Sequence, residues 1–255
     1  YFFIPLVRAK FGDEFVYLNE GTRFNEPGTS CNDQAYVLSR DGTISNINVA
    51  EGKKDRVEFD YLVELDKDGT AEITFEKRIY GVSVGNFRKQ YNEMLPEIKR
   101  RQLLEIVGSW GNGAEPVGEL HADTVSYPAV MRYKARVRDY ALIQNSRMHL
   151  KLPTRLTHAV FSLGDDAREN PMFFAKSTPS SIHAKIIFPD GYSLWSMVPK
   201  SVCWTLPGNL GRVEIKIDRS KDEKGRLVLN ATRNNLHLSG EVAPELYPTL
   251  LEYNR

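Results

Sequence analysis

The five histidines are the first residues to test for chemistry, because imidazole is the usual general base and metal ligand in proteins. They are His121, His149, His158, His183 and His237. No two of them have the His-x-His or His-x-x-x-His spacing that brings two rings to one face of a strand or helix. The sequence therefore predicts no metal site and no cofactor, and it favours histidines that are exposed or satisfied in a core.

The two cysteines are the candidate nucleophiles. A catalytic Cys needs a nearby His that is itself oriented by a carboxylate or an amide. Cys31 follows the turn-like PGTS, and Cys203 lies in the apolar segment SVCWTLPG, where burial raises a thiol pKa and makes the thiol inert. We expect two free, partly buried cysteines. A single disulfide between them stays open as the alternative, and two thiolates are too few for a four-thiolate zinc site.

The acidic and glycine-rich segments are explained by turns and helix ends rather than by catalysis or ligand binding. Turn formation explains the acids of GDDARE more simply than a hydrolase dyad does, and these acids are Asp165, Asp166 and Glu169. The segment DKDGT lacks the spaced acceptors and the bidentate Glu of a calcium loop, so we predict a hairpin turn. The glycines of GSWGNG follow a helical segment and end it, so they do not indicate a nucleotide-binding loop.

Composition sets limits on the partners of the chain. Its 255 residues are 41% hydrophobic, enough for a real core. The 34 Lys and Arg balance 33 Asp and Glu, which gives no net field toward nucleic acid or an anionic membrane. No apolar run approaches the roughly 20 residues of a membrane helix, and no leader peptide is evident. Because the first residue is Tyr1, we expect the cut edge of a longer or processed protein.

Period-two alternation is the clearest structural signal. It predicts a hairpin over residues 56–80 with its turn at Asp68-Gly69, and a long amphipathic strand over residues 129–137. Further strands are predicted at SIHAKIIF, RVEIKID, GRLVLNATR and NNLHLSGEV. We therefore predict a mainly-β fold, an antiparallel β-sandwich, for residues 49–255.

Helical periodicity appears twice. One amphipathic helix is predicted near residues 86–107, in which Pro96 either produces a kink or begins a second helix. A short C-terminal helix is predicted in PELYPTLLEY. Residues 1–48 read as a strand, a turn at Gly12-Asp13, a second strand, a loop and a further strand. These strands are too few to form a stable sheet by themselves. They therefore need partner strands, either upstream or on the remainder of the chain.

The stretch PLVRAKFGDEFVYLNEGTRFNEPGTSCNDQAYVLSRDGT resembles the end of the catalytic core of bacterial transglutaminase-like proteins. The likeness continues through DGTAEITFEKRIYG, YPAVMRYKARVRDYA, FPDGYSLWSMVP and PELYPTLLEY, which look like the β-rich region after that core. The resemblance covers nearly all 255 residues. It implies that residues 1–48 are the incomplete end of a transglutaminase-like core and that residues 49–255 are an accessory domain.

The resemblance also implies catalytic positions that this chain fills differently. The nucleophilic Cys of the family lies upstream, and its His and Asp lie on the last two strands of the core. Ile4 or Phe3 stands where the His is expected, and Asn19 stands where the Asp is expected, in YLNEGT. An Asn can orient an imidazole, but Ile4 cannot move a proton. No complete catalytic set is therefore predicted within this chain.

Three functions remain as hypotheses. The first is a non-catalytic accessory region that acts in binding or scaffolding, with a protein or glycan ligand. The second is part of a Cys-His-Asp/Asn transglutaminase or cysteine peptidase, with Asn19 as third member and the nucleophile supplied from upstream. The third is carbohydrate or cell-wall binding through exposed aromatic side chains, namely Trp110, Trp195 and Trp204. The resemblance implies a periplasmic, envelope-associated or secreted location.

Overall fold

The computed structural model describes residues 6–12, 14–18, 23–29, 36–47, 49–157, 163–164, 168–175, 177–193 and 200–253. Of these residues, 45% lie in strands and 20% in helices, which confirms the predicted mainly-β class. Within the same ranges, no helix is both long enough and apolar enough to cross a lipid bilayer.

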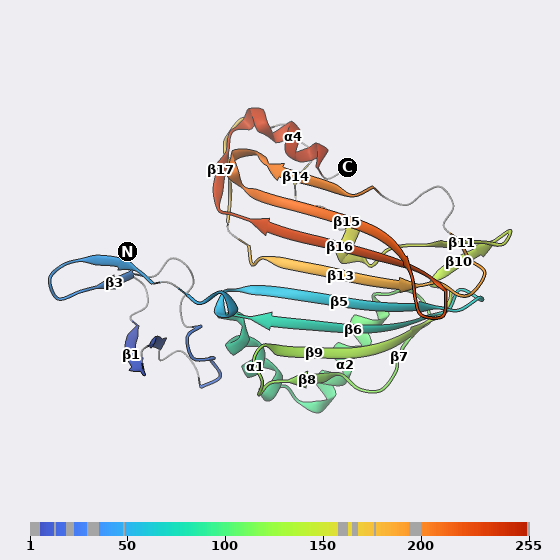
Figure 1. The fold of residues 1–255 in the computed structure, drawn as a ribbon, viewed down its shortest axis with the longest axis horizontal. Helices are drawn as coiled ribbons and strands as arrows, with labels where there is room; N and C mark the ends of the chain where they lie inside the picture. Colours follow the sequence, from blue (N-terminus) through green and yellow to red (C-terminus); the bar gives the residue numbers. More distant parts are fainter. Residues whose placement is uncertain are drawn as a thin grey trace.

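A nine-stranded sheet forms the body of the molecule (Figure 1). Its strand order is β14-β15-β16-β13-β5-β6-β9-β7, and β8 also pairs with β9. The strands are β5 (Arg56–Leu65), β6 (Ala71–Tyr80), β7 (Ala114–Pro116), β8 (His121–Asp123), β9 (Ala129–Val137), β13 (Ser180–Ile187), β14 (Val202–Leu206), β15 (Gly211–Lys221) and β16 (Leu227–His237). All neighbours are antiparallel except β13 and β5, which are parallel.

The hairpin of β5 and β6 confirms the alternation read from the sequence. The apolar residues that share one phase are buried, among them Val63, Ile73 and Phe75. In the turn, the Thr70 amide donates to Asp68 Oδ1 at 2.9 Å, and Gly69 has φ of +87°. The DKDGT segment is therefore a hairpin turn, as predicted.

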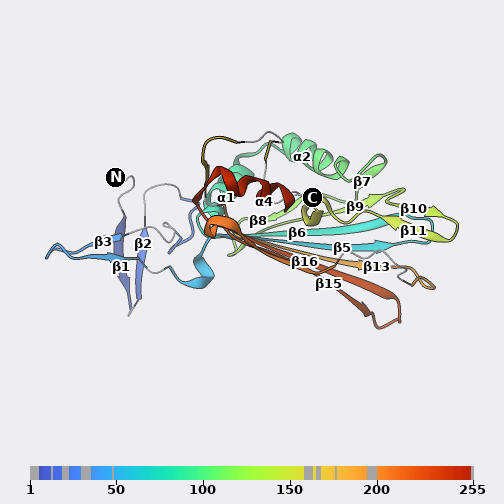
Figure 2. The same cartoon turned by 90° about the horizontal axis from the view of Figure 1, so that it is seen from above.

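The antiparallel sandwich is not confirmed. The long strands of residues 56–237 join one mixed sheet, and the other described sheets have two strands each. Helices and irregular segments, not a second large sheet, cover the apolar face (Figure 2). Alternation marks one buried face on each strand but does not say what covers it, and β13 joins β5 across more than 100 residues of sequence.

The predicted helix near residues 86–107 is two helices. The backbone is extended at Met94 and Leu95, and Pro96 is the first residue of the second helix, a position that needs no backbone N–H. The predicted C-terminal helix is present, and its Leu250 is fully buried. The helices are η1 (Glu51–Lys53), α1 (Ser83–Glu93), α2 (Pro96–Gly108), α3 (Thr154–Thr157), η2 (Pro207–Asn209), η3 (Pro244–Leu246) and α4 (Tyr247–Glu252).

Four two-stranded sheets complete the described structure. They pair β1 (Val7–Phe11) with β2 (Glu14–Leu18), β3 (Tyr36–Leu38) with β4 (Ile44–Asn46), β10 (Ala141–Gln144) with β11 (Arg147–Leu150), and β12 (Met172–Phe174) with β17 (Gly240–Val242). The pairing of β1 with β2 was predicted. The β1-β2 and β3-β4 hairpins, which we call the N-terminal hairpins, lie beyond the end of the large sheet (Figure 1). They expose large apolar side chains, namely Val7, Phe11, Phe15, Tyr36, Leu38 and Ile44.

Candidate functional site

Several of the sequence-predicted site residues lie outside the described residues. They are Phe3, Ile4, Asn19, Cys31, His158, Asp165, Asp166 and Trp195. The catalytic interpretation of Asn19 is therefore left as a sequence expectation. Cys203 is a free cysteine, so the alternative of a Cys31–Cys203 disulfide is not borne out.

The remaining histidines do not come together as ligands. His121, His149 and His183 are exposed on three different strands, and His237 is half-buried on β16. His183 Nδ1 lies 3.3 Å from Thr232 Oγ1. In the part of the chain that the structure describes, no three His, Cys, Asp or Glu side chains form a group that could hold a metal ion.

Cys203 departs from its predicted environment. It lies on β14 at the edge of the sheet, where it is exposed, and Arg212 Nε donates to its Sγ at 3.1 Å. The expectation of a partly buried Cys203 in apolar surroundings is wrong, because strand alternation turns its neighbour Trp204 toward the apolar face and Cys203 away from it.

The two described tryptophans pack against other aromatic rings. Trp110 meets Tyr61 edge-to-face at 5.6 Å between centroids, and its Nε1 donates to the Tyr133 hydroxyl at 3.1 Å. Trp204 packs on Tyr253 of the C-terminal segment at 5.8 Å. These contacts give Trp110 a core role, and Trp204 is half-buried at the sheet edge.

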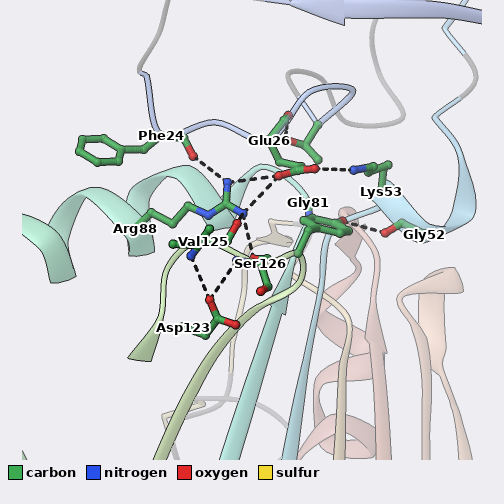
Figure 3. Close-up of polar contacts among 11 residues, drawn as sticks. Phe24, Glu26, Gly52, Lys53, Gly81, Arg88, Asp123, Val125 and Ser126 are labelled. Atoms are coloured by element: carbon green, nitrogen blue, oxygen red, sulfur yellow. Dashed lines mark hydrogen bonds and ion pairs between the residues drawn. The ribbon is translucent and has the colours of Figure 1, made fainter. Parts of the chain in front are cut away.

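The most extensive polar site surrounds Arg88, where the N-terminal segment meets the sheet. We call it the Arg88 junction, and its members are Phe24, Glu26, Gly52, Lys53, Gly81, Arg88, Asp123, Val125, Ser126 and Tyr127. Arg88 lies on α1, and its side chain is only 8% exposed. The other members come from the N-terminal segment, from η1, from the turn between β6 and α1, and from the end of β8 and the loop that follows it (Figure 3).

The Arg88 guanidinium joins two of these segments directly. On the N-terminal side, it donates to the Phe24 carbonyl at 3.3 Å, and both of its Nη atoms lie 3.2 Å from Glu26 Oε2. On the sheet side, Nη2 donates to the carbonyls of Val125 at 3.1 Å and Ser126 at 2.9 Å. One buried side chain therefore cross-links residues 24–26 to the loop that leads into β9.

Local turns prepare the acceptors for Arg88. Asp123 Oδ1 accepts the amides of Val125 at 3.0 Å and Ser126 at 2.9 Å, an Asx turn that directs both carbonyls toward the guanidinium. These backbone hydrogen bonds, with that of Ser126 the largest, lower the pKa of Asp123 to about 2. Pro27 and Gly28, whose φ is +81°, form a turn after Glu26 that Thr29 closes through both its amide and its hydroxyl.

Tyr127 and Lys53 connect η1 to the same junction. The Tyr127 hydroxyl donates to the Gly52 carbonyl at 2.7 Å and accepts the Gly81 amide at 3.2 Å. Lys53 Nζ lies 2.9 Å from Glu26 Oε1 and 4.0 Å from the centroid of the Tyr127 ring. Glu26 is therefore held by two cations, one from α1 and one from η1.

Two glycines allow the backbone segments to approach this closely. A Cβ at Gly85, in the first turn of α1, would lie 1.9 Å from Asn25 Oδ1. A Cβ at Gly81, where φ is +73°, would lie 2.1 Å from Asp55 Oδ1. A side chain at position 81 would force the backbone of Asp55 to move, and a side chain at position 85 would force the Asn25 side chain away.

The charges at Glu26 favour its ionised form. Desolvation by burial acts to raise the pKa of Glu26, but hydrogen bonds and charges from Lys53 and Arg88 outweigh it, and the pKa lies below the usual 4.5. The carboxylate is therefore ionised at neutral pH and pairs with both cations. Because the two Nη atoms of Arg88 are directed at protein acceptors, the geometry suits a structural joint rather than ligand binding or proton transfer.

Sequence reasoning did not identify this junction. Arg88 is one cation among several in an amphipathic helix, and nothing in its neighbours distinguishes it from Lys89. The glycines at positions 81 and 85 are the available signal, because glycine inside or just before a helix needs a packing reason.

Comparison with known proteins gives this chain no family. No protein-family model matches the sequence, and no curated protein is significantly similar to it. The transglutaminase-like resemblance is therefore carried forward as a proposal.

Proposed function

We propose that this chain is a non-catalytic, β-rich accessory region of a transglutaminase-like protein, and that it acts as a scaffold. The observation that carries the scaffolding role is the Arg88 junction. A buried arginine with hydrogen bonds to two separate chain segments fixes their relative position, and breaking such a charge pair is costly. The large sheet thereby gives the N-terminal segment a rigid support.

The exposed apolar side chains of the N-terminal hairpins support a binding role. Val7 is 66% exposed, Phe11 62% and Leu38 72%. Exposed large apolar side chains are candidates for contact with a protein partner. Two-stranded hairpins gain stability when their faces are covered. The proposed partner is therefore an apolar protein surface, for which a transglutaminase-like core is the candidate suggested by the sequence.

The same sequence resemblance is the basis for the remaining parts of the proposal. It places Asn19 at the acid position of the family, with Ile4 or Phe3 at the position of the His. A chain with this pattern lacks the imidazole that activates a thiol. We propose an exported or envelope-associated location on the same basis.

Thiol reactivity and amine incorporation test the non-catalytic assignment. The 255-residue chain is treated with an iodoacetamide probe at pH 7, and in parallel with a fluorescent primary amine and a glutamine-containing protein. We expect the exposed Cys203 to be labelled at the rate of a surface thiol. We expect no rapid labelling of Cys31 and no incorporation of the amine. A Cys31→Ser variant is the matched control. Rapid labelling of Cys31 together with amine incorporation that this variant abolishes would overturn the non-catalytic assignment.

A further inference from the structure

A second group of cations lies on the helix-covered face of the sheet. Lys77 on β6, Phe59 on β5, Ile182 on β13 and Arg233 on β16 are neighbours on one cross-strand row. All four occupy the phase that otherwise carries core residues. Arg155 of α3 approaches this row from above, because its guanidinium carbon lies 4.3 Å from the Phe59 ring centroid. Lys77 Nζ lies 5.8 Å from the same centroid, so two cations share one ring.

These two cations have no carboxylate partner among the described residues. Neither Lys77 nor Arg155 forms an ion pair there. The opposite face of the sheet shows a different balance, since Arg78 alone pairs with Glu58 at 3.2 Å, Asp60 at 2.9 Å and Glu76 at 2.6 Å. Burial and then the charge of Arg155 lower the pKa of Lys77, as expected for like charges that share a partly desolvated site.

Arg233 anchors α3 beside this pair. Its Nη1 donates to the carbonyl of Leu156 at 3.3 Å, and its Nε donates to Asn235 Oδ1 at 2.8 Å. The carbonyls at the end of α3 thus have a donor, and Arg155 is held over the row. Because these acceptors are neutral, they do not balance the charges of Lys77 and Arg155.

Buried tyrosine hydroxyls add further donors to the same place. Tyr61 and Tyr133 are 6% and 4% exposed, and desolvation raises the pKa of both, so both keep their protons. The charge of Arg155 acts on the Tyr61 hydroxyl by lowering its pKa against the larger effect of burial, and Trp110 Nε1 donates to the Tyr133 hydroxyl at 3.1 Å. Neither hydroxyl has an acceptor for its own proton in the described part of the chain. The site therefore has an excess of donors and positive charge.

We propose that Lys77 and Arg155, whose cationic groups lie against the Phe59 ring, together bind an oxyanion, a phosphate, sulfate or carboxylate group. The planar guanidinium can hold two oxygens at once, and the ammonium supplies a third contact as a point charge. Arg155 is exposed and Lys77 is half-buried, so the site opens to solvent on the α3 side. This inference does not depend on the proposed scaffolding function.

Anion titration of the 255-residue chain tests the site, with inorganic phosphate, sulfate and acetate as probes and chloride at equal ionic strength as the reference. Isothermal titration and side-chain NMR signals of Lys77 report binding. We expect Lys77→Met and Arg155→Met each to lower the affinity for the preferred anion by about tenfold, the usual effect of one charged hydrogen bond. Lys134→Met is the matched control, because Lys134 is exposed on the opposite face of β9 and should leave binding unchanged.

The three probes also distinguish which class of ligand supplies the anionic group. Preference for phosphate or sulfate indicates a phosphorylated or sulfated ligand, and preference for acetate indicates an acidic peptide or organic acid. Without added anion, Lys77→Met should be at least as stable as the unmodified chain, because it removes repulsion. Equal binding by all variants, no binding beyond chloride, or a Lys77→Met chain that is clearly less stable without anion would each overturn the proposal.

Discussion

Replacing Arg88 by Met keeps an unbranched side chain in α1 but removes every donor that joins the two segments. The carbonyls of Phe24, Val125 and Ser126 lose a donor in a buried site, and Glu26 keeps only Lys53 at 2.9 Å. Breaking a buried charge pair costs about 3 to 5 kcal/mol. Glu26 is 20% exposed and retains one cation, so we expect the lower end of this range. The free energy needed to open the junction should fall by about 3 kcal/mol.

Native-state hydrogen exchange measures this opening directly. The amides of Thr29, Gly81 and Ser126 have acceptors within the junction, and their protection should fall on the order of 100-fold in Arg88→Met. Arg132→Met is the control, because Arg132 is half-exposed on the face of the sheet that is not covered by helices. Its replacement should lower the free energy of unfolding by under about 1 kcal/mol. If Arg88→Met does not fold, Glu26→Gln is the milder test, because it removes the ion pairs and leaves the hydrogen bonds of Arg88 to the three carbonyls. Unchanged protection at Thr29 and Ser126 would refute the cross-linking role.

Two further predictions concern the Arg88 junction, and a third concerns the core beneath α4. Gly85→Ala should destabilise the junction by forcing Asn25 away, whereas Gly108→Ala, with open space at its Cβ, should not; hydrogen exchange of both variants shows the difference. Because the pKa of Glu26 is lowered on folding, its ionised form contributes to the free energy of unfolding; this contribution is complete above pH 4.5 and is lost as the pH falls through the folded pKa. Glu26→Gln should remove this part of the pH dependence when the free energy of unfolding is measured across the acid range. Leu250→Ala, at a fully buried position of α4, should lower the free energy of unfolding by about 3 kcal/mol in urea.

Local patterns in the sequence were enough to predict the hairpins and the helical segments. The 56–80 hairpin and the 129–137 strand were correct because alternation and the Asp68-Gly69 turn depend on residues close in the chain. The parallel pairing of β13 with β5 could not be predicted in this way, because it joins distant segments and depends on competition among all strands. The same reason explains why a sandwich was predicted where one large mixed sheet is present.

Both polar sites needed the three-dimensional arrangement, but one left a signal in the sequence. Lys77 lies in phase with Ile73, Phe75 and Ile79, and Arg233 lies in phase with Leu229 and Ala231. A cation at a core-facing strand position is unusual and needs a partner or a function. Arg88 gave no such signal, because its acceptors are mostly backbone carbonyls, which no residue pattern reveals.

A distance measurement between the N-terminal segment and the sheet tests the scaffolding role most directly. Spin labels at Arg23→Cys and Lys185→Cys, both exposed positions, are introduced with Cys31 and Cys203 replaced by Ser, and the distance distribution is measured by pulsed electron resonance. The proposal predicts one narrow distribution that broadens when Arg88→Met is added. A distribution that is already broad with Arg88 present, or one that stays narrow without it, would contradict a joint held by Arg88.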